Sequence, residues 1–127
     1  MHKSCLGAII IDCQTDDLER EVRFWSQALG YKTVAPQPGD DPNYIALKVP
    51  EGKPEIEVQR VAHPSRVHLD LKTDNVAAEV ARLEKLGARV VEVLERWTVM
   101  EAPSGQRFCV VVAPSVERYG STNVWEE

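Results

Sequence analysis

The sequence predicts an α+β domain made of two strand–helix–strand–strand–strand repeats, whose sheets curl into a cup-shaped cleft with the helices outside. Residues 66–87 show a strand, a helix start, an amphipathic helix and a glycine stop. Residues 7–30 show the same arrangement: Thr15 precedes Thr73 by 58 positions, and Gly30 precedes Gly87 by 57. Strand-like runs follow both helices. A repeat this long in 127 residues predicts two equal units that pack against each other.

The second unit opens with alternating apolar and polar side chains, the pattern of a half-buried strand. The apolar set is Val67, Leu69 and Leu71, and the polar set is His68, Asp70 and Lys72. Asp74 is expected to cap the following helix, because its carboxylate can accept a hydrogen bond from the first turn. Apolar residues at helical spacing follow, at Val76, Val80, Leu83 and Leu86, before Gly87 ends the helix.

The elements divide the chain into two repeats, a linker and a tail. Repeat one spans about 5–61, with a strand over 5–13, a helix over 16–29 and strands over 31–34, 44–49 and 55–61. The linker is 62–65. Repeat two spans about 66–113, and after its helix it has strands over 88–94, 97–101 and 107–113. The tail is 114–127. We expect one domain over 1–127, since this length suits a single core.

The faces of the predicted strands differ in polarity. Ile9 and Ile11 match Val67 and Leu69 on the side that faces the helices, and Ile10 and Asp12 match His68 and Asp70 on the other side. In strand 55–61, Glu55, Glu57 and Gln59 share one face. A sheet with helices on one face must cover or curl its other face. The polar face is therefore expected to line the cleft.

The net charge and the distribution of apolar residues and cysteines limit which classes of binding partner and cellular location are expected. A net charge of −5 and a pI of about 5.2 argue against nucleic acid and anionic membranes, which bind basic surfaces. The apolar run from Cys5 to Ile11 is too short for a membrane span or a signal core. Cys5, Cys13 and Cys109 are odd in number and lack CxxC spacing. We expect free buried thiols and a cytoplasmic protein.

Several motifs resemble one superfamily. They are HLDL at 68–71, LGAR at 86–89, WTVMEAPSGQRFCVV at 97–111 and FWSQALGY at 24–31. Together they resemble the glyoxalase, bleomycin-resistance and extradiol-dioxygenase group, the vicinal oxygen chelate superfamily, from about Cys5 to Ala113. The resemblance implies two βαβββ units that form a cup. It does not select a reaction, because the group includes isomerases, lyases, dioxygenases, thiol transferases and drug-binding proteins.

The resemblance also implies where a divalent metal would sit. In the enzymes of this group the ligands come from the first and last strand of each unit, and those positions correspond here to Ile10, Glu55, His68 and Arg107. Ile10 has no donor atom, and Arg107 is a permanent cation that would repel a metal. Zinc normally takes three or more protein ligands. We therefore expect a degenerate metal site, with His68 and Glu55 as the residual candidate positions and no cofactor.

Seven side chains are candidates for ligand binding: His68, Glu55, Glu57, Arg107, Asp70, Trp97 and Tyr44. His68 could instead be a general base or a structural strand residue, and the glutamates could form a solvated face. Trp97 and Tyr44 could stack on a flat ligand or pack in the core. Arg107 is expected to pair with Glu55 or Glu57. With a mostly neutral His68, the cleft carries excess negative charge, which favours a cationic ligand.

The main functional hypothesis is a protein that binds a small organic molecule in the cleft, as bleomycin-resistance proteins do. The alternative is a metal-dependent lyase, isomerase or dioxygenase of the same superfamily, with Ni, Zn, Fe or Mn. A second alternative is a structural or regulatory dimer without a ligand. We expect a homodimer in each case, and no nucleic acid or membrane partner.

Overall fold

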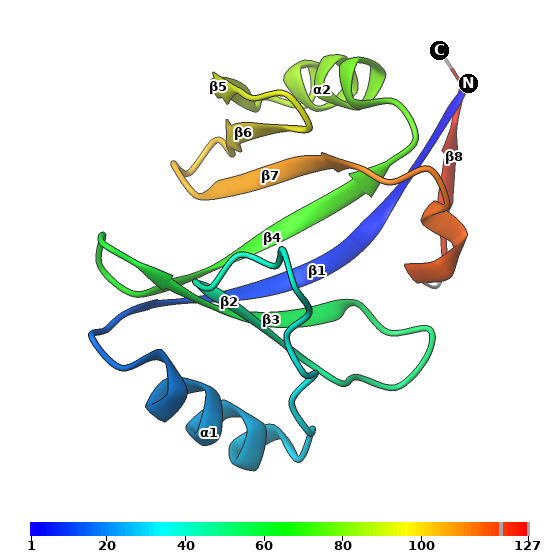
Figure 1. Cartoon of the computed structure of the whole chain (residues 1–127). Coiled ribbons are helices and arrows are strands. Elements are labelled where there is room, and N and C mark those ends of the chain that lie inside the picture. The colour runs from blue at the N-terminus through cyan, green and yellow to red at the C-terminus, as the bar shows by residue number, and fades with distance from the viewer. Residues whose placement is uncertain (120, 127) are drawn as a thin grey trace.

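The computed structural model describes residues 1–119 and 121–126, which form one curled, open sheet with two helices packed against it (Figure 1). The first unit contains β1 (His2–Gln14), α1 (Leu18–Leu29), β2 (Tyr44–Leu47) and β3 (Glu55–Val61). The second contains β4 (Arg66–Thr73), α2 (Val76–Lys85), β5 (Arg89–Val93), β6 (Trp97–Glu101) and β7 (Arg107–Val112). Neither helix of the described residues has the length and apolar run that crossing a membrane requires.

The two units meet edge to edge through their first strands. The strand order is β2-β3-β1-β4-β7-β6-β5, with β1 and β4 antiparallel at the junction. In each unit the first strand pairs in parallel with the last, β1 with β3 and β4 with β7. Figure 1 shows α1 and α2 at opposite ends of the curled sheet. This architecture confirms the predicted α+β fold of two βαβββ units.

Local capping explains where the helices begin and end. The Asp17 side chain caps α1 by accepting a hydrogen bond from the Arg20 N–H at 3.1 Å. Gly30 closes α1 with a φ of 76°, a left-handed conformation that glycine adopts without strain. The N-cap of α2 is Asn75, one residue after the predicted Asp74, and its side chain accepts a hydrogen bond from the Ala78 N–H at 3.1 Å. Asp74 instead accepts from the Lys3 N–H at 2.9 Å.

The predicted strand over 31–34 is reduced to a single bridge between Thr33 and Leu47. The segment that follows contains Pro36, Pro38 and Pro42, which cannot donate to a strand ladder. The chain therefore leaves the sheet early and forms a long loop before β2. In contrast, β1 begins at His2, earlier than predicted, because the C-terminal tail pairs with its start.

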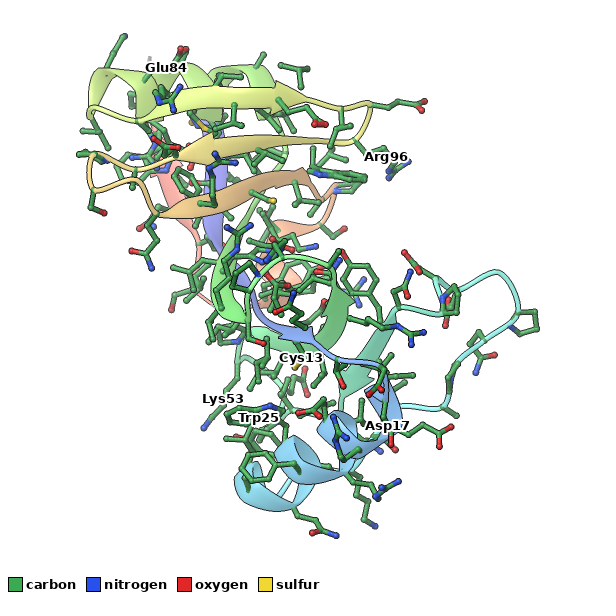
Figure 2. All side chains as sticks on the ribbon, turned by 90° about the vertical axis from the view of Figure 1, so that its left-hand side faces the viewer. Cys13, Asp17, Trp25, Lys53, Glu84 and Arg96 are labelled. Carbon is green, nitrogen blue, oxygen red and sulfur yellow. The ribbon has the colours of Figure 1, made fainter. Side chains whose placement is uncertain are left out.

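Both helices cover the same, apolar face of the sheet. In the first unit the buried residues are Ile11, Cys13, Leu18, Val22, Leu47 and Val58, and in the second they are Leu83, Met100 and Val110. Figure 2 shows Cys13 of β1 and Trp25 of α1 in the lower unit, and Trp25 packs, partly buried, against the first cluster. The alternate strand residues point to the opposite side, which we call the helix-free face: Ile10, Asp12, Glu57, His68, Asp70 and Cys109 lie on it.

The tail packs on its own chain. A short helix, η1 (Val116–Tyr119), precedes β8 (Asn123–Trp125), which pairs with β1 from His2 to Ser4. The Trp125 Nε1–H donates to Ser4 Oγ at 2.8 Å, and its ring lies 3.8 Å from the Arg82 guanidinium. These contacts hold the tail beside α2. Residues 120 and 127 of the predicted tail lie outside the described residues.

The assignment of the faces can be tested on β6. Met100 is fully buried beneath α2, whereas Val99 points to the helix-free face and is half-buried. Met100→Ala is expected to reduce the free energy of unfolding by about 2–5 kcal/mol, because it leaves a cavity in the core. Val99→Ala, measured in the same urea titration, should have the smaller effect. Equal losses at the two positions would show that the faces are reversed.

Candidate functional site

Three adjacent strands bring four polar side chains together on the helix-free face. Asp12 comes from β1, His68 and Asp70 come from β4, and Cys109 comes from β7. The β1–β4 register places Ile10 opposite His68, and the β4–β7 register places Asp70 opposite Cys109. Side chains two residues apart on a strand share a face. The sheet pairing alone therefore gathers these groups around His68.

His68 lies between two carboxylates. Its Nδ1 is 2.7 Å from Asp12 Oδ2, and its Nε2 is 3.4 Å from Asp70 Oδ1. Asp12 is only 2% exposed, so its charge needs a partner inside the protein. The structure places Asp12 and Asp70 on either side of His68, and Asp12 orients the imidazole ring.

The carboxylates hold His68 in its charged form. Burial by itself would lower the pKa of His68, but hydrogen bonds with Asp12, Asp70 and Cys109 outweigh it and raise the pKa to about 11. The expectation of a mostly neutral His68 was therefore wrong. The reason is that the sequence does not show how closely a buried carboxylate approaches the ring.

An acidic hollow lies in the first unit, on the helix-free face. It has a volume of about 330 Å³ and is lined by Asp40, Asp41, Tyr44, Ala46 and Glu57. Burial raises the pKa of Glu57, and the charges of Glu55 and Asp70 raise it further. Burial also raises the pKa of Tyr44 to about 12, with a further contribution from Glu57. The hollow thus combines an aromatic ring with carboxylates that are not fully compensated.

The positions that the family resemblance assigns to metal ligands do not form a metal site. Ile10 is 1% exposed and has no donor atom. Its partner in β3 is Glu57, and Glu55 lies two pairs further along, opposite Ala8. The Arg107 Nε–H donates to Glu101 Oε2 at 3.1 Å, which corrects the expected pairing with Glu55 or Glu57. A cation and an isoleucine thus occupy two of the four positions.

A different set of donors could hold a metal. His68, Asp70 and Cys109 each offer one ligand atom, and these three atoms lie within 4.8 Å of one another. Asp12 hydrogen-bonds to Nδ1 of the His68 ring. Histidine, carboxylate and thiolate are ligands that Zn²⁺ accepts, and a carboxylate behind the histidine is a common support. However, a metal would need the ring nitrogen that now carries a proton. Metal and proton therefore compete for the same ring.

The structure separates the predicted site residues into groups. His68 and Asp70 lie together, Glu57 and Tyr44 line the acidic hollow, and Glu55 begins β3 beside them. Trp97 is 41% exposed and lines another hollow, between α2 and the β5–β6 turn. The sequence interpretation overlooked Cys109, although strand alternation places it on the same face as Arg107. It also overlooked Asp40 and Asp41, whose place depends on the loop.

The charge on His68 predicts how stability depends on pH. Because its folded-state pKa of about 11 exceeds its ordinary value of 6.5, the stabilisation is fully present below pH 6.5 and is lost as pH rises toward 11. Urea titrations across this range should show the free energy of unfolding falling more steeply in the wild type than in His68→Asn. His63→Asn, the same substitution in the linker, should behave like the wild type. Parallel curves for wild type and His68→Asn would contradict the charged ring.

Solved structures share this fold. A methylmalonyl-CoA epimerase from Mycobacterium tuberculosis is 19% identical, with 87% of this chain and 89% of that chain covered and a TM-score of 0.64. A Streptomyces coelicolor methylmalonyl-CoA epimerase variant, bound to 2-nitronate-propionyl-CoA, is 19% identical over 89% and 96% of the two chains, with a TM-score of 0.64. A hypothetical protein from Bacillus halodurans is 12% identical over 87% and 94%, also with a TM-score of 0.64.

Because these structures are only 12–19% identical to this chain, their similarity establishes a shared fold and nothing further. A comparison with curated protein sequences finds no match. The sequence profile of the glyoxalase-like domain matches residues 8–111, which include both βαβββ units from β1 to β7. This match extends over most of the chain and agrees with the motifs at 24–31, 68–71, 86–89 and 97–111. The chain therefore belongs to the glyoxalase-like domain family.

Proposed function

We propose that this protein binds a small organic cation in the acidic hollow of the helix-free face, without a metal at the positions that the family resemblance indicates. The observation that carries the proposal is the raised pKa of Glu57, caused by burial and by the charges of Glu55 and Asp70. A buried carboxylate among like charges is destabilised. A bound cation would relieve that repulsion and gain affinity from it.

The surrounding charges support this choice of ligand. His68 is matched by Asp12 and Asp70, and Arg107 is matched by Glu101. Lys72 acts on Glu57 in the opposite sense, yet the pKa of Glu57 remains raised, because burial and the neighbouring carboxylates outweigh Lys72. Asp40 and Asp41 add two more carboxylates at the rim. A hollow of one sign attracts ligands of the other sign, and the Tyr44 ring offers a face to a cation.

The alternative is a metal-dependent isomerase of the same superfamily. It is favoured by the His68, Asp70 and Cys109 group and by the fold shared with methylmalonyl-CoA epimerases. A coenzyme A ester is strongly anionic, and the acidic hollow would oppose it. We therefore place this function second. The homodimer stays a prediction, for which Val67 and Leu69 supply exposed apolar side chains on the helix-bearing face.

The ligand's charge can be tested with three compounds of one shape: benzylamine, benzyl alcohol and benzoate. Benzylamine should raise the melting temperature most, and its affinity should fall as salt rises, because partly exposed charges are screened. Glu57→Gln should weaken benzylamine binding about tenfold, which corresponds to ~1.4 kcal/mol, by isothermal titration calorimetry.

Glu84→Gln is the matched control, since Glu84 lies on the outer side of α2, far from the hollow (Figure 2). It should bind benzylamine as the wild type does. Stabilisation mainly by benzoate would show that the hollow has been assigned the wrong sign. Equal loss of affinity in both variants would show that Glu57 has no special part in binding.

A further inference from the structure

A second hollow lies in the second unit, between the first turns of α2 and the turn that joins β5 to β6. It has a volume of about 810 Å³, and we call it the α2 hollow. Most of its lining is apolar and comes from the helix, the sheet and the turn: Val76, Val80, Val90, Val112, Leu94 and Trp97. Leu94 and Trp97 remain exposed at its mouth. An apolar hollow of this size suits a small organic molecule.

Hydrogen bonds hold both walls of the α2 hollow in place. In the turn, the Leu94 N–H donates to the Trp97 carbonyl at 2.9 Å, and the Arg96 carbonyl accepts from the Val112 N–H at 3.2 Å. On the other side, the Asn75 side chain caps α2 and fixes its first turn. The two walls therefore stand without a ligand. A preformed site binds more tightly, because little conformational freedom is lost on binding.

Thr98 places a hydroxyl group in this apolar lining. Its side chain is 4% exposed, and it lies on β6 opposite the core residue Val110. Asp12 Oδ1 is the only completely covered side-chain atom of the described residues that lacks a hydrogen bond. The Thr98 oxygen also has no hydrogen-bond partner within this part of the chain, so it is not completely covered and opens into the hollow that Thr98 lines.

An unpaired hydroxyl at such depth is unusual, because buried polar groups nearly always have a hydrogen-bond partner. Thr73, which is buried as well, follows the rule: its hydroxyl donates to the Lys3 carbonyl at 2.7 Å and accepts from the Asn75 N–H at 3.1 Å. The Thr98 hydroxyl can both donate and accept. It therefore offers a bound molecule one hydrogen bond inside an otherwise apolar hollow.

The charges at the rim of the α2 hollow are of both signs. Arg96 and Glu95 are neighbours in the β5–β6 turn, and Figure 2 shows Arg96 at the outer end of the second unit. The Asp74 carboxylate accepts a hydrogen bond from the Lys3 N–H at 2.9 Å, and the Lys3 ammonium interacts favourably with it. Neither sign prevails. Because moving a charge between apolar side chains is costly, the lining favours a neutral ligand.

We propose that the α2 hollow binds a flat, neutral aromatic molecule that carries one hydroxyl group. The ring lies against the apolar side chains and Trp97, whose indole suits a flat partner, and the hydroxyl group pairs with Thr98. This site is on the helix-bearing face, apart from the acidic hollow and from Cys109. That thiol was expected to be buried but is half-buried on the helix-free face. The proposal does not depend on cation binding at Glu57.

Three compounds that share the naphthalene rings test the proposal: 2-naphthol, naphthalene and 2-naphthoate. In nitrogen-15 NMR titrations of the intact protein, 2-naphthol should shift the amide signals of Val80 and Thr98 and the indole signal of Trp97 until they saturate. It should bind about fivefold more tightly than naphthalene, which lacks the hydroxyl group, and more tightly than the anionic 2-naphthoate. Shifts confined to the helix-free face, or tighter binding of 2-naphthoate, would overturn the proposal.

Thr98→Val isolates the hydroxyl group, because valine has nearly the same shape. It should weaken 2-naphthol binding about fivefold and leave naphthalene binding unchanged. The free energy of unfolding should not fall, since the folded protein loses no hydrogen bond. Thr33→Val, the same substitution at an exposed position of the first unit, should bind 2-naphthol as the wild type does.

Unchanged 2-naphthol affinity in Thr98→Val would overturn the proposal. If that variant does not fold, the comparison of 2-naphthol with naphthalene on the wild type decides. Benzylamine binding should be the same in Thr98→Val and the wild type, and 2-naphthol binding should be the same in Glu57→Gln and the wild type. The two sites can therefore be confirmed or rejected separately.

Discussion

Antiparallel hydrogen bonding between β1 and β4 determines which side chains meet in the cup. Ile9 lies opposite Leu69, and Ile11 lies opposite Val67, so these apolar residues of both units share the helix-bearing face. His68 and Asp70 lie on the other face with Asp12 and Ile10. A register shift of one residue would reverse every side chain of a strand. Because both helices need the apolar face, they lie on the same side and leave the polar face uncovered. The grouping of Asp12, His68 and Asp70 follows from this junction.

The buried Asp12 carboxylate then determines the electrostatics of the centre. A charge that is 2% exposed is costly unless it is paired, and His68 pairs with it at 2.7 Å. The imidazole is thereby kept protonated, and a protonated ring has no lone pair to offer a metal. His68, which lies between Asp12 and Asp70, is at one of the four positions that the family resemblance assigns to ligands, and Ile10 and Arg107 are at two of the others.

Much of the fold could be predicted because it depends on local patterns. Alternation in 66–73, helical spacing in 76–86 and glycines at 30 and 87 each reflect one element, and their repetition indicates two equal units. The pairing of Arg107 with Glu101 was missed, although the tight turn between them places the two residues directly opposite each other in the β6–β7 hairpin. The expected partners, Glu55 and Glu57, lie on β3, which β1 and β4 separate from β7 in the sheet.

The centre of the site was less predictable, for physical reasons. The pKa of His68 depends on distances of a few ångströms to Asp12 and Asp70, which come from the twist and pairing of strands far apart in sequence. The exposure of Cys109 depends on the curvature of the sheet. The acidic hollow depends on a proline-rich loop that brings Asp40 and Asp41 to Tyr44 and Glu57. No local sequence pattern predicts these distances, this exposure or this loop position.

The central claim is that His68 is an imidazolium held between two carboxylates. Nitrogen-15 NMR of the histidine rings measures this directly, since protonated and unprotonated ring nitrogens differ widely in chemical shift, and His68→Asn assigns the signal. With a pKa of about 11, both His68 nitrogens should remain protonated well above neutral pH, while a solvent-exposed histidine titrates near 6.5. A His68 ring that is neutral at neutral pH would contradict the account.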